Sequence, residues 1–344
     1  MEIILQFFRY ILFPFGVIYA IVTEIRNFLF DKAILKSEKF DIPIINVGNL
    51  SVGGTGKTPQ IEYLIKLLKN DYKIAVLSRG YKRSTSGFIV ADKNSSAEQI
   101  GDEPYQIFRK FNDIIVCVGE KRVPAIQQII KNFNPDVILL DDAFQHRAVK
   151  AGLNIVLTPF SLPFSKDFIL PVGDLRECRH HIRRADLLIV SKTPENIEEG
   201  QKNKIKQSIG KYYKKDVFFS SIKYADKVIN ERNEIKINDL SNYKLLIVTG
   251  IAKPDVIFTF FSKKSINFES LKFGDHHNFS DKDINLITKK FGEIEAENKL
   301  IVTTEKDYVR WNNKHNLPVY YLPIETKIEN KALFNQKIID YVRK

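Results

Sequence analysis

A glycine-rich segment that ends in Gly-Lys-Thr carries the most specific chemical signal in this 344-residue chain. It follows an apolar run at 44–47 and precedes apolar residues at helical spacing, so it should join a strand to a helix. In a phosphate-binding loop of this kind, backbone N–H groups surround a polyphosphate, the lysine reaches the β- and γ-phosphates, and the threonine hydroxyl binds Mg²⁺. The predicted phosphate-binding residues are Gly53, Gly54, Thr55, Gly56, Lys57 and Thr58.

Two adjacent carboxylates, Asp141 and Asp142, end another apolar run at 137–140. In phosphate-loop enzymes a carboxylate at a strand end holds Mg²⁺, directly or through water. Adjacent carboxylates repel each other unless a cation or hydrogen-bond donors lie nearby, although a solvated turn is the alternative. Gln145 and His146 follow at once, so polar groups gather where open α/β sheets place their sites.

Two further turns could supply metal binding or proton transfer. Asp102 and Glu103 precede a predicted helix, where simple helix capping is the alternative. The segment 274–280 places a carboxylate beside His276, which can orient the imidazole and raise its basicity. A helix start capped by Ser280 is the alternative there.

Arg176 lies in the loop 170–177, and its guanidinium suits a phosphate, although a solvated surface arginine has the same sequence signature. The segment 303–307 follows a predicted strand and could contact a nucleotide or form a plain charged turn. Pro194 stands where a guanine-specific Asn/Thr-Lys-x-Asp element needs Asp, which favours ATP over GTP.

Cys178, His180 and His181 could suggest zinc, but their spacing fits no common zinc site and adjacent histidines seldom share a metal. We therefore expect no zinc centre. Cys178 and Cys117 are the chain's two cysteines; they form no disulfide framework and indicate a reducing compartment. The net charge of +12 points to anionic partners without choosing among nucleic acid, nucleotide, phosphorylated substrate and membrane.

Short apolar runs alternate with helical patterns, which predicts an α/β fold with a mostly parallel sheet and helices on both faces. A polar stretch at 224–243 separates this region from a second α/β block. The expected parts are an apolar N-terminal helix at 1–30, a phosphate-loop domain at 31–222, and a smaller α/β domain with its connector at 223–344.

The N-terminal segment 3–22 is apolar and aromatic, and Pro14 should bend it. The 14 residues Tyr10–Thr23 carry no charge, whereas a membrane-spanning helix needs about 20 apolar residues. Arg26 and Lys32 suit a helix that lies in the headgroup layer, so attachment to a membrane surface is favoured over a buried core helix or a true span. No basic leader precedes the segment, which argues against a signal peptide.

Together these motifs resemble the lipid A 4'-kinase family, also called tetraacyldisaccharide 4'-kinases, nearly from end to end. Each motif alone is unspecific, but their combination is highly specific. The segments that carry the resemblance are 47–59, 77–81, 101–104, 141–146, 170–177, 275–277 and 304–307. Ser51, which replaces the first glycine of the usual phosphate loop, is ordinary for this family. Ala143 in place of Gly and Asp174 in place of Pro are departures that affect loop shape and remove no reactive group.

The resemblance implies an enzyme at the cytoplasmic face of the inner membrane of Gram-negative bacteria, as a peripheral or monotopic protein. It would use ATP and Mg²⁺ to phosphorylate the 4'-hydroxyl of an acylated glucosamine disaccharide 1-phosphate. In that reaction Asp102, paired with His276, would accept the hydroxyl proton, and Lys57 would hold the β- and γ-phosphates. The other implied contacts are Thr58, Glu103, Asp141 and Asp142 for the metal, Glu305, Lys306 and Asp307 for the nucleotide, and Gln145, His146 and Arg176 for the substrate.

Two other interpretations stay open at this point. A phosphate-loop kinase or ATPase of similar fold could act on a soluble small molecule. A membrane-attached nucleic-acid binder is suggested only by the positive charge and leaves the phosphate loop unexplained, so no nucleic-acid partner is expected. The oligomeric state is not predicted.

Overall fold

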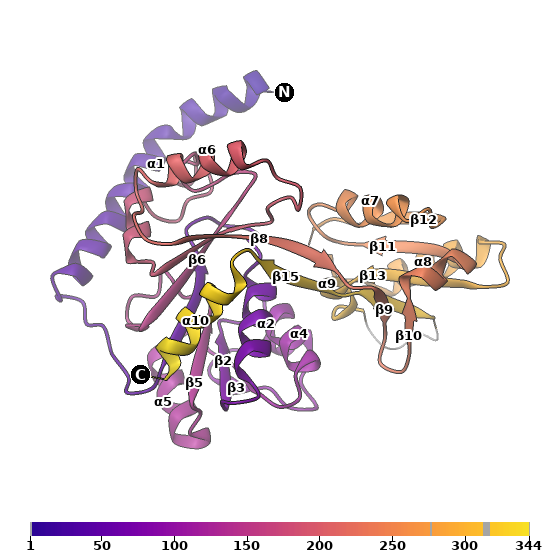
Figure 1. Cartoon of the computed structure of the whole chain (residues 1–344), viewed down its shortest axis with the longest axis horizontal. Helices are drawn as coiled ribbons and strands as arrows, with labels where there is room; N and C mark the ends of the chain where they lie inside the picture. The colour runs from indigo at the N-terminus through magenta and orange to yellow at the C-terminus, as the bar shows by residue number, and fades with distance from the viewer. Residues whose placement is uncertain (1, 276, 312–316, 344) are drawn as a thin grey trace.

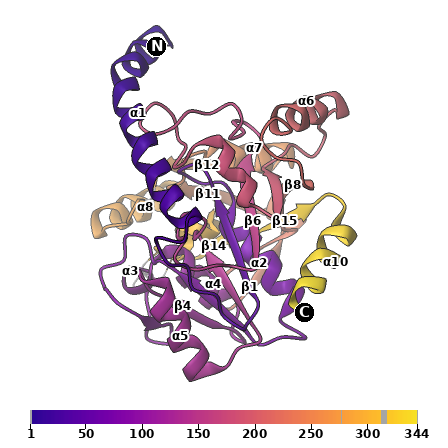
Figure 2. The same cartoon turned by 90° about the vertical axis from the view of Figure 1, so that its left-hand side faces the viewer.

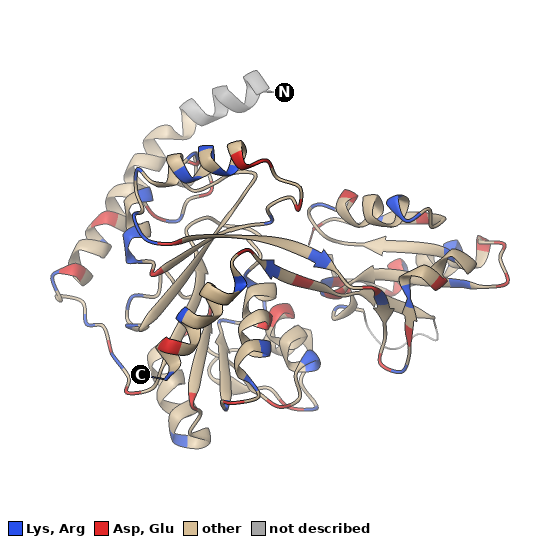
Figure 3. Ribbon diagram, in the orientation of Figure 1, with Lys and Arg blue, Asp and Glu red and all other residues tan. Residues whose placement is uncertain are grey.

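Two mixed β-sheets organise the chain into a larger and a smaller lobe (Figure 1). The computed structural model describes residues 2–275, 277–311 and 317–343, with side chains described from Ile11 onward. The long helix α1 (Glu2–Asp31) lies against the larger lobe, on the side away from the smaller one (Figures 1 and 2). Basic and acidic residues are interspersed over both lobes, so the net charge of +12 is not confined to one of them (Figure 3).

The larger sheet has nine strands, with β1 between β6 and β5 at its centre. Its strands, in spatial order, are β15 (Ile324–Ile328), β8 (Val217–Tyr224), β7 (Leu187–Ser191), β6 (Leu153–Pro159), β1 (Ile44–Asn49), β5 (Val137–Asp141), β2 (Ile74–Ser78), β4 (Ile115–Val118) and β3 (Ile89–Val90). Neighbours pair in parallel except β3 and β15, the two edge strands. Every residue of β1, β2, β5 and β7 is buried, as expected for parallel strands covered on both faces.

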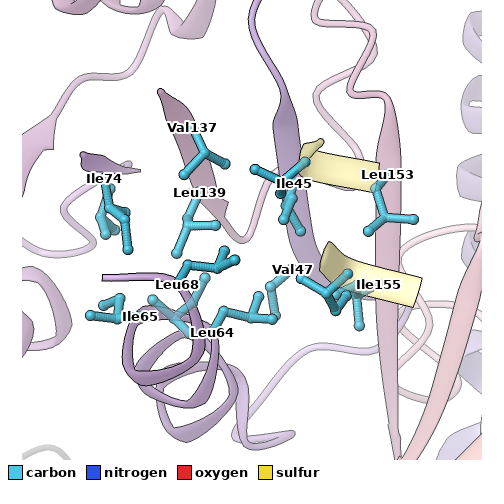
Figure 4. Packing of buried hydrophobic residues seen from close by; sticks show 14 of the residues in the cluster. Ile45, Val47, Leu64, Ile65, Leu68, Ile74, Val137, Leu139, Leu153 and Ile155 are labelled. Atoms are coloured by element: carbon cyan, nitrogen blue, oxygen red, sulfur yellow. The ribbon is translucent and has the colours of Figure 1, made fainter. Parts of the chain in front are cut away.

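Helices cover both faces of this sheet because successive residues of a strand point to opposite sides. Ile45 packs in a core with Leu64 and Ile65 of α2 (Figure 4), whereas Ile44 packs in a second core with α5. Burying each such side chain stabilises the fold by about 1.5–3 kcal/mol. The helices of the larger lobe other than α1 are α2 (Lys57–Leu68), α3 (Ala97–Ile100), α4 (Asp102–Lys110), α5 (Arg122–Phe133), η1 (Arg179–Arg184), α6 (Glu199–Ile209) and α10 (Lys331–Val342).

The smaller lobe is built on a six-stranded sheet. Its strands, in spatial order, are β10 (Glu234–Lys236), β9 (Lys227–Ile229), β14 (Val319–Leu322), β13 (Lys299–Thr304), β11 (Lys244–Thr249) and β12 (Phe268–Lys272). Its helices are η2 (Ile237–Asn242), α7 (Asp255–Lys263), α8 (Asp281–Glu293) and α9 (Glu305–Tyr308). The two lobes and the apolar N-terminal helix confirm the predicted fold class.

The chain crosses between the lobes twice, from β8 into β9 and from β14 back into β15. The sequence analysis assigned residues 223–344 to the smaller domain, but β15 and α10 lie in the larger lobe. β15 pairs with β8, and Phe334 and Ile338 of α10 are fully buried in the same core as α2. The apolar face of α10 therefore packs in the core of the larger lobe. The spacing of apolar residues along the chain does not show on which sheet a helix packs.

The described side chains of α1 are mostly exposed, including Phe13 at 58%, Ile18 at 59% and Val22 at 59%. The 21 residues Ile11–Asp31 are long and apolar enough to cross a membrane by length and composition, and 11% of that window is buried. This exposure does not fit the alternative of a buried core helix. The larger lobe thus carries along one side an apolar helix whose described side chains are mostly exposed.

A buried group of three charges joins the lobes. Lys110 of α4 lies 2.6 Å from Glu62 of α2 and 2.6 Å from Glu305 of α9, and the two carboxylate side chains are 4% and 6% exposed. Burial raises the pKa of Glu305 to about 7, and the negative charge of Glu62 acts in the same direction. Although burial disfavours the Lys110 ammonium, the two carboxylates hold its pKa above the ordinary value. The lysine is therefore the counter-charge that allows both carboxylates to be buried.

Replacing that lysine should be costly. We expect Lys110→Met to lower the free energy of unfolding by about 3–5 kcal/mol, because two buried carboxylates lose their counter-charge. Urea unfolding followed by circular dichroism measures this, and the deficit should shrink from about pH 8 to about pH 5 as Glu305, with its pKa raised to about 7, takes up a proton. The matched control is Lys66→Met, which removes the exposed Lys66–Glu325 pair and should cost at most about 1 kcal/mol. Equal losses in the two variants would contradict this role.

Candidate active site

The loop between β1 and α2 has the conformation that a phosphate-binding loop requires. Gly53 and Gly56 both have φ of 91°, a region where a side chain is strained, and Gly56 is the N-cap of α2. Asn49 Nδ2 donates to Thr55 Oγ1 at 2.9 Å, and Ser191 Oγ donates to the Thr55 carbonyl at 2.6 Å. The ends of two strands thus fix the loop, and the free N–H groups of a helix N-terminus lie beside it.

The loop that carries Arg176 is bonded to the phosphate loop by backbone hydrogen bonds. The Val52 N–H donates to the Asp174 carbonyl, and the Arg176 N–H donates to the Leu50 carbonyl, both at 2.7 Å. The Asp174 N–H donates to Asp167 Oδ1 at 3.2 Å. A proline at position 174 has no N–H to donate, so the departure from the family pattern gives this loop an additional anchor.

The predicted metal carboxylates lie at the end of β5, facing the phosphate loop. Lys57 Nζ is 3.5 Å from Asp142 Oδ2, and Arg176 holds both oxygens of Asp142 at 3.0 and 3.1 Å. Asp141 is 5% exposed, and its Oδ2 accepts from Ser78 Oγ at 3.1 Å. Among the described residues no partner reaches its buried Oδ1. The structure therefore brings Lys57, Asp141, Asp142 and Arg176 together.

The electrostatics of this cluster favour a bound cation. Burial raises the pKa of Asp141 to about 6; the charges of Asp142 and Glu103 act in the same direction, and Lys57 opposes them. A carboxylate that is costly to ionise in the protein alone is relieved by a nearby cation. Thr58, the second residue of α2, is the predicted hydroxyl ligand, and carboxylate and hydroxyl oxygens are the ligand type that Mg²⁺ prefers. The residues present therefore fit a magnesium ion.

Gln145 connects the cluster to the N-terminal helix. Its Nε2 donates to the Asn49 carbonyl at 3.0 Å, and its Oε1 accepts from Arg176 at 3.4 Å. Arg26 of α1 donates to the Gln145 carbonyl at 2.8 Å. The N-terminal helix is thus one hydrogen bond away from a residue that also contacts the end of β1, just before the phosphate loop.

His146 has the environment of a neutral imidazole. Burial lowers its pKa to about 4, and the positive charges of Arg122, Arg26 and Arg79 lower it in the same direction. Near neutral pH it therefore acts as a hydrogen-bonding group without charge.

Asp102 is held by the smaller lobe. Arg310 donates from Nε to Asp102 Oδ2 at 2.7 Å, and its Nη2 lies 2.6 Å from the same oxygen. The expected partner of Asp102, His276, lies outside the described residues. Gly101 precedes Asp102 with φ of 93°, and a Cβ there would meet Gly80 Cα at 3.1 Å. The position of Asp102 therefore depends on a close backbone crossing and on an arginine from the other lobe.

The three side chains of the segment 305–307 make contacts with different parts of the molecule. Lys306 Nζ lies 3.5 Å from Glu103 Oε1, next to the metal carboxylates. Asp307 is fully buried, and its Oδ2 accepts from the Gly250 N–H at 2.9 Å. Glu305 belongs to the buried pair with Lys110. Lys306 is thus the member that contacts a predicted metal ligand of the larger lobe, and the nucleotide contacts predicted for all three residues stay predictions.

Two lysines that the sequence analysis did not select lie at the same place. Lys192 donates to the Gly54 carbonyl at 2.5 Å. Desolvation lowers the pKa of Lys192, and the charges of Lys253, Lys306 and Lys57 add to the effect. Lys57, Lys192, Lys253 and Lys306 thus contribute positive charge near the phosphate loop. Lys192 directly follows a strand end, a signal that could have found it, whereas Lys253 comes from the other lobe and has no such signal.

Known proteins share this architecture and sequence. The model of one family, described as tetraacyldisaccharide-1-P 4'-kinase, matches residues 8–343. The tetraacyldisaccharide 4'-kinase of Flavobacterium psychrophilum is 49% identical over 343 residues, which cover 98% of each chain. That of Bacteroides thetaiotaomicron is 44% identical and covers 96% of this chain and 93% of its own. A solved structure of LpxK from Aquifex aeolicus in complex with ATP has a TM-score of 0.81 and 29% identity, covering 97% of this chain and 99% of that one.

The phosphate loop leads to a direct test. Lys57→Ala should lower turnover of a nucleoside triphosphate by about 10²-fold or more, because it removes a charge aimed at the transferred phosphoryl group. Steady-state kinetics on the folded variant measures this. The matched control is Lys66→Ala, on the same helix but exposed and away from the loop, which should leave turnover unchanged. A folded Lys57→Ala protein with near-normal turnover would rule out the assignment.

Proposed function

The chain belongs to the tetraacyldisaccharide-1-P 4'-kinase family, and from this premise we propose that it phosphorylates the lipid A precursor. The reaction is transfer of the γ-phosphate of ATP to the 4'-hydroxyl of the acylated glucosamine disaccharide 1-phosphate. The observation that carries the proposal is the meeting of Lys57, Asp141 and Asp142 at one sheet edge, joined through Gln145 to an exposed apolar helix. The expected family resemblance is thereby confirmed.

ATP would lie with its phosphates on the loop from Gly53 to Thr58 and at the N-terminus of α2. The four lysines around the loop would hold the β- and γ-phosphates, and two of them, Lys253 and Lys306, come from the smaller lobe. The ATP complex of LpxK from Aquifex aeolicus supports ATP as the nucleotide. Binding of the phosphates would also relieve the mutual repulsion of the lysines and draw the two lobes together.

Thr58, Asp141 and Asp142, with Glu103, would hold Mg²⁺, which supplies neutralisation of the charge that develops on the β- and γ-phosphates. Arg176 keeps Asp142 in place through both carboxylate oxygens. Ser78 holds Asp141 through Oδ2 alone. These contacts orient the carboxylates before the metal arrives. The protein therefore contributes a preorganised set of charges, which is the main source of catalysis in phosphoryl transfer.

Asp102 would accept the proton of the sugar hydroxyl during in-line attack, with His276 as its proposed partner. Proton transfer need only be partial if the transition state is loose. Arg310 holds the carboxylate from the smaller lobe. Because the base and its anchor come from different lobes, productive geometry would depend on how closely the lobes meet.

The substrate head group would meet the site from the side of α1, at the cytoplasmic face of the membrane. Asp31 of α1 pairs with Arg147 at 2.5 Å, and Arg26 donates to the backbone of Gln145, so the helix and the site are fixed relative to each other. Arg176, Gln145 and the neutral His146 are the proposed substrate contacts. The apolar face of α1 would lie in the lipid layer that holds the acyl chains.

The decisive test is transfer of labelled γ-phosphate from ATP to the acylated disaccharide 1-phosphate in mixed micelles. We expect Mg²⁺-dependent product carrying the label at the 4'-position, and no transfer by Asp141→Asn. If ATP is hydrolysed without transfer to the lipid, while a water-soluble acceptor is phosphorylated, the chain is instead a kinase of soluble molecules.

Removing residues 1–22 separates the role of the helix from that of the site. The deletion keeps Arg26 and Asp31, so we expect an unchanged kcat and ATP affinity but a several-fold higher KM for the lipid and weaker cosedimentation with vesicles. The control is Asp31→Asn in the full chain, which weakens a contact to the larger lobe but keeps the apolar face. A shortened protein that stays on vesicles with its original KM would show that the segment is not the anchor.

A further inference from the structure

A second cluster of chemically active side chains lies away from the phosphate loop, where α1 packs against the short helix η1. Glu24 of α1 lies between two histidines of η1. His181 Nε2 is 2.8 Å from Glu24 Oε1, and His180 Nε2 is 3.3 Å from Glu24 Oε2. Residues 157 positions apart in the chain therefore share one contact, and neither partner belongs to the kinase site.

The local geometry explains how adjacent histidines can act together. The two imidazole rings of η1 lie side by side, with centroids 4.2 Å apart and ring planes tilted by 43°. One ligand atom from each of Glu24, His180 and His181 lies within 4.8 Å of the other two. This spacing fits three ligands of a single ion. From the sequence no zinc centre was expected, because adjacent histidines seldom share a metal. Glu24 comes from a distant helix, so spacing along the chain does not reveal it as a third ligand.

Cys178, which directly precedes η1, lies beside the same group. Its thiol donates a hydrogen bond to the Glu24 carboxylate that both histidines contact. Bound to a cation, Cys178 would act as a thiolate ligand and release its proton.

A further carboxylate supports a positive charge at this place. Glu177 is 1% exposed, and its Oε1 has no partner among the described residues. Its Oε2 accepts from Arg184 and, at 3.2 Å, from Asn27 of α1. A buried carboxylate oxygen without a described partner thus lies just before η1 and adds negative charge near the proposed site.

We propose that Glu24, His180 and His181 bind one zinc-class divalent cation that fastens the N-terminal helix to the larger lobe. Imidazole nitrogen with carboxylate oxygen is a zinc ligand set, and Cys178 or a water molecule completes four-fold coordination. Mg²⁺, which prefers oxygen ligands, does not compete. The ion acts as a clip: Arg176 and Glu177 directly precede η1, so the clip also steadies the loop that holds Asp142. This inference does not depend on the proposed function.

The test is equilibrium dialysis of the full-length, tag-free protein in detergent against Zn²⁺ or Co²⁺, without nucleotide and with excess Mg²⁺. We expect one tightly bound equivalent. Glu24→Gln and His180→Ala change partly exposed side chains, so both should fold, and each should weaken binding by at least about 100-fold. The wild-type protein with tetrahedral Co²⁺ should show intense visible absorption. If its spectrum has a sulfur charge-transfer band that Cys178→Ser loses, the thiolate is the fourth ligand. If the wild type shows no such band, the fourth ligand is water.

Asp31→Asn is the matched control, because it removes another α1 contact but no proposed ligand. It should bind zinc like the wild type. The proposal is overturned if the wild type binds no more zinc than Glu24→Gln, or if Asp31→Asn loses binding to the same extent. Circular dichroism of each variant confirms that its fold is intact.

Discussion

The buried carboxylate of Asp141 at the end of β5 is the constraint around which the larger lobe is arranged. A parallel sheet covered on both faces leaves its strand ends as the place where charge can gather, and there Lys57, Asp142 and Arg176 balance one another within 3.5 Å. Removing any one of them leaves an uncompensated charge. The phosphate loop, the Arg176 loop and the strand end are therefore one electrostatic unit.

The smaller lobe adds charged side chains to that unit. It contributes Lys253 and Lys306 near the phosphate loop and Arg310 to Asp102, while the buried Lys110 group keeps α9 on the larger lobe. Basic side chains near the phosphate loop thus come from both lobes. A polyanion bound between the lobes can offset the repulsion among these side chains, which couples nucleotide binding to the distance between the lobes.

Local sequence predicted the phosphate loop and Asp141–Asp142 because the reactive residues directly follow their strands. The loop that carries Arg176 does not directly follow a strand, and Arg176 was selected because its guanidinium suits a phosphate. Contacts across the lobes could not be predicted: Arg310 is 208 positions from Asp102, and nothing near either residue marks the other. For the same reason α10 was assigned to the wrong side of the connector, and Glu24 was missed as a neighbour of two histidines.

The two crossings between the lobes meet at one point, where the Ala225 N–H donates to the Pro323 carbonyl at 2.9 Å. The smaller lobe is thus an insertion in the sequence between β8 and β15, which are neighbouring antiparallel strands of the larger sheet. The two ends of the insertion are in contact. A connection of a few residues at that point would close β8 and β15 into a hairpin and leave the nine-stranded sheet continuous. The smaller lobe is therefore a module that evolution could add, exchange or reshape without redesigning the core that binds the phosphates.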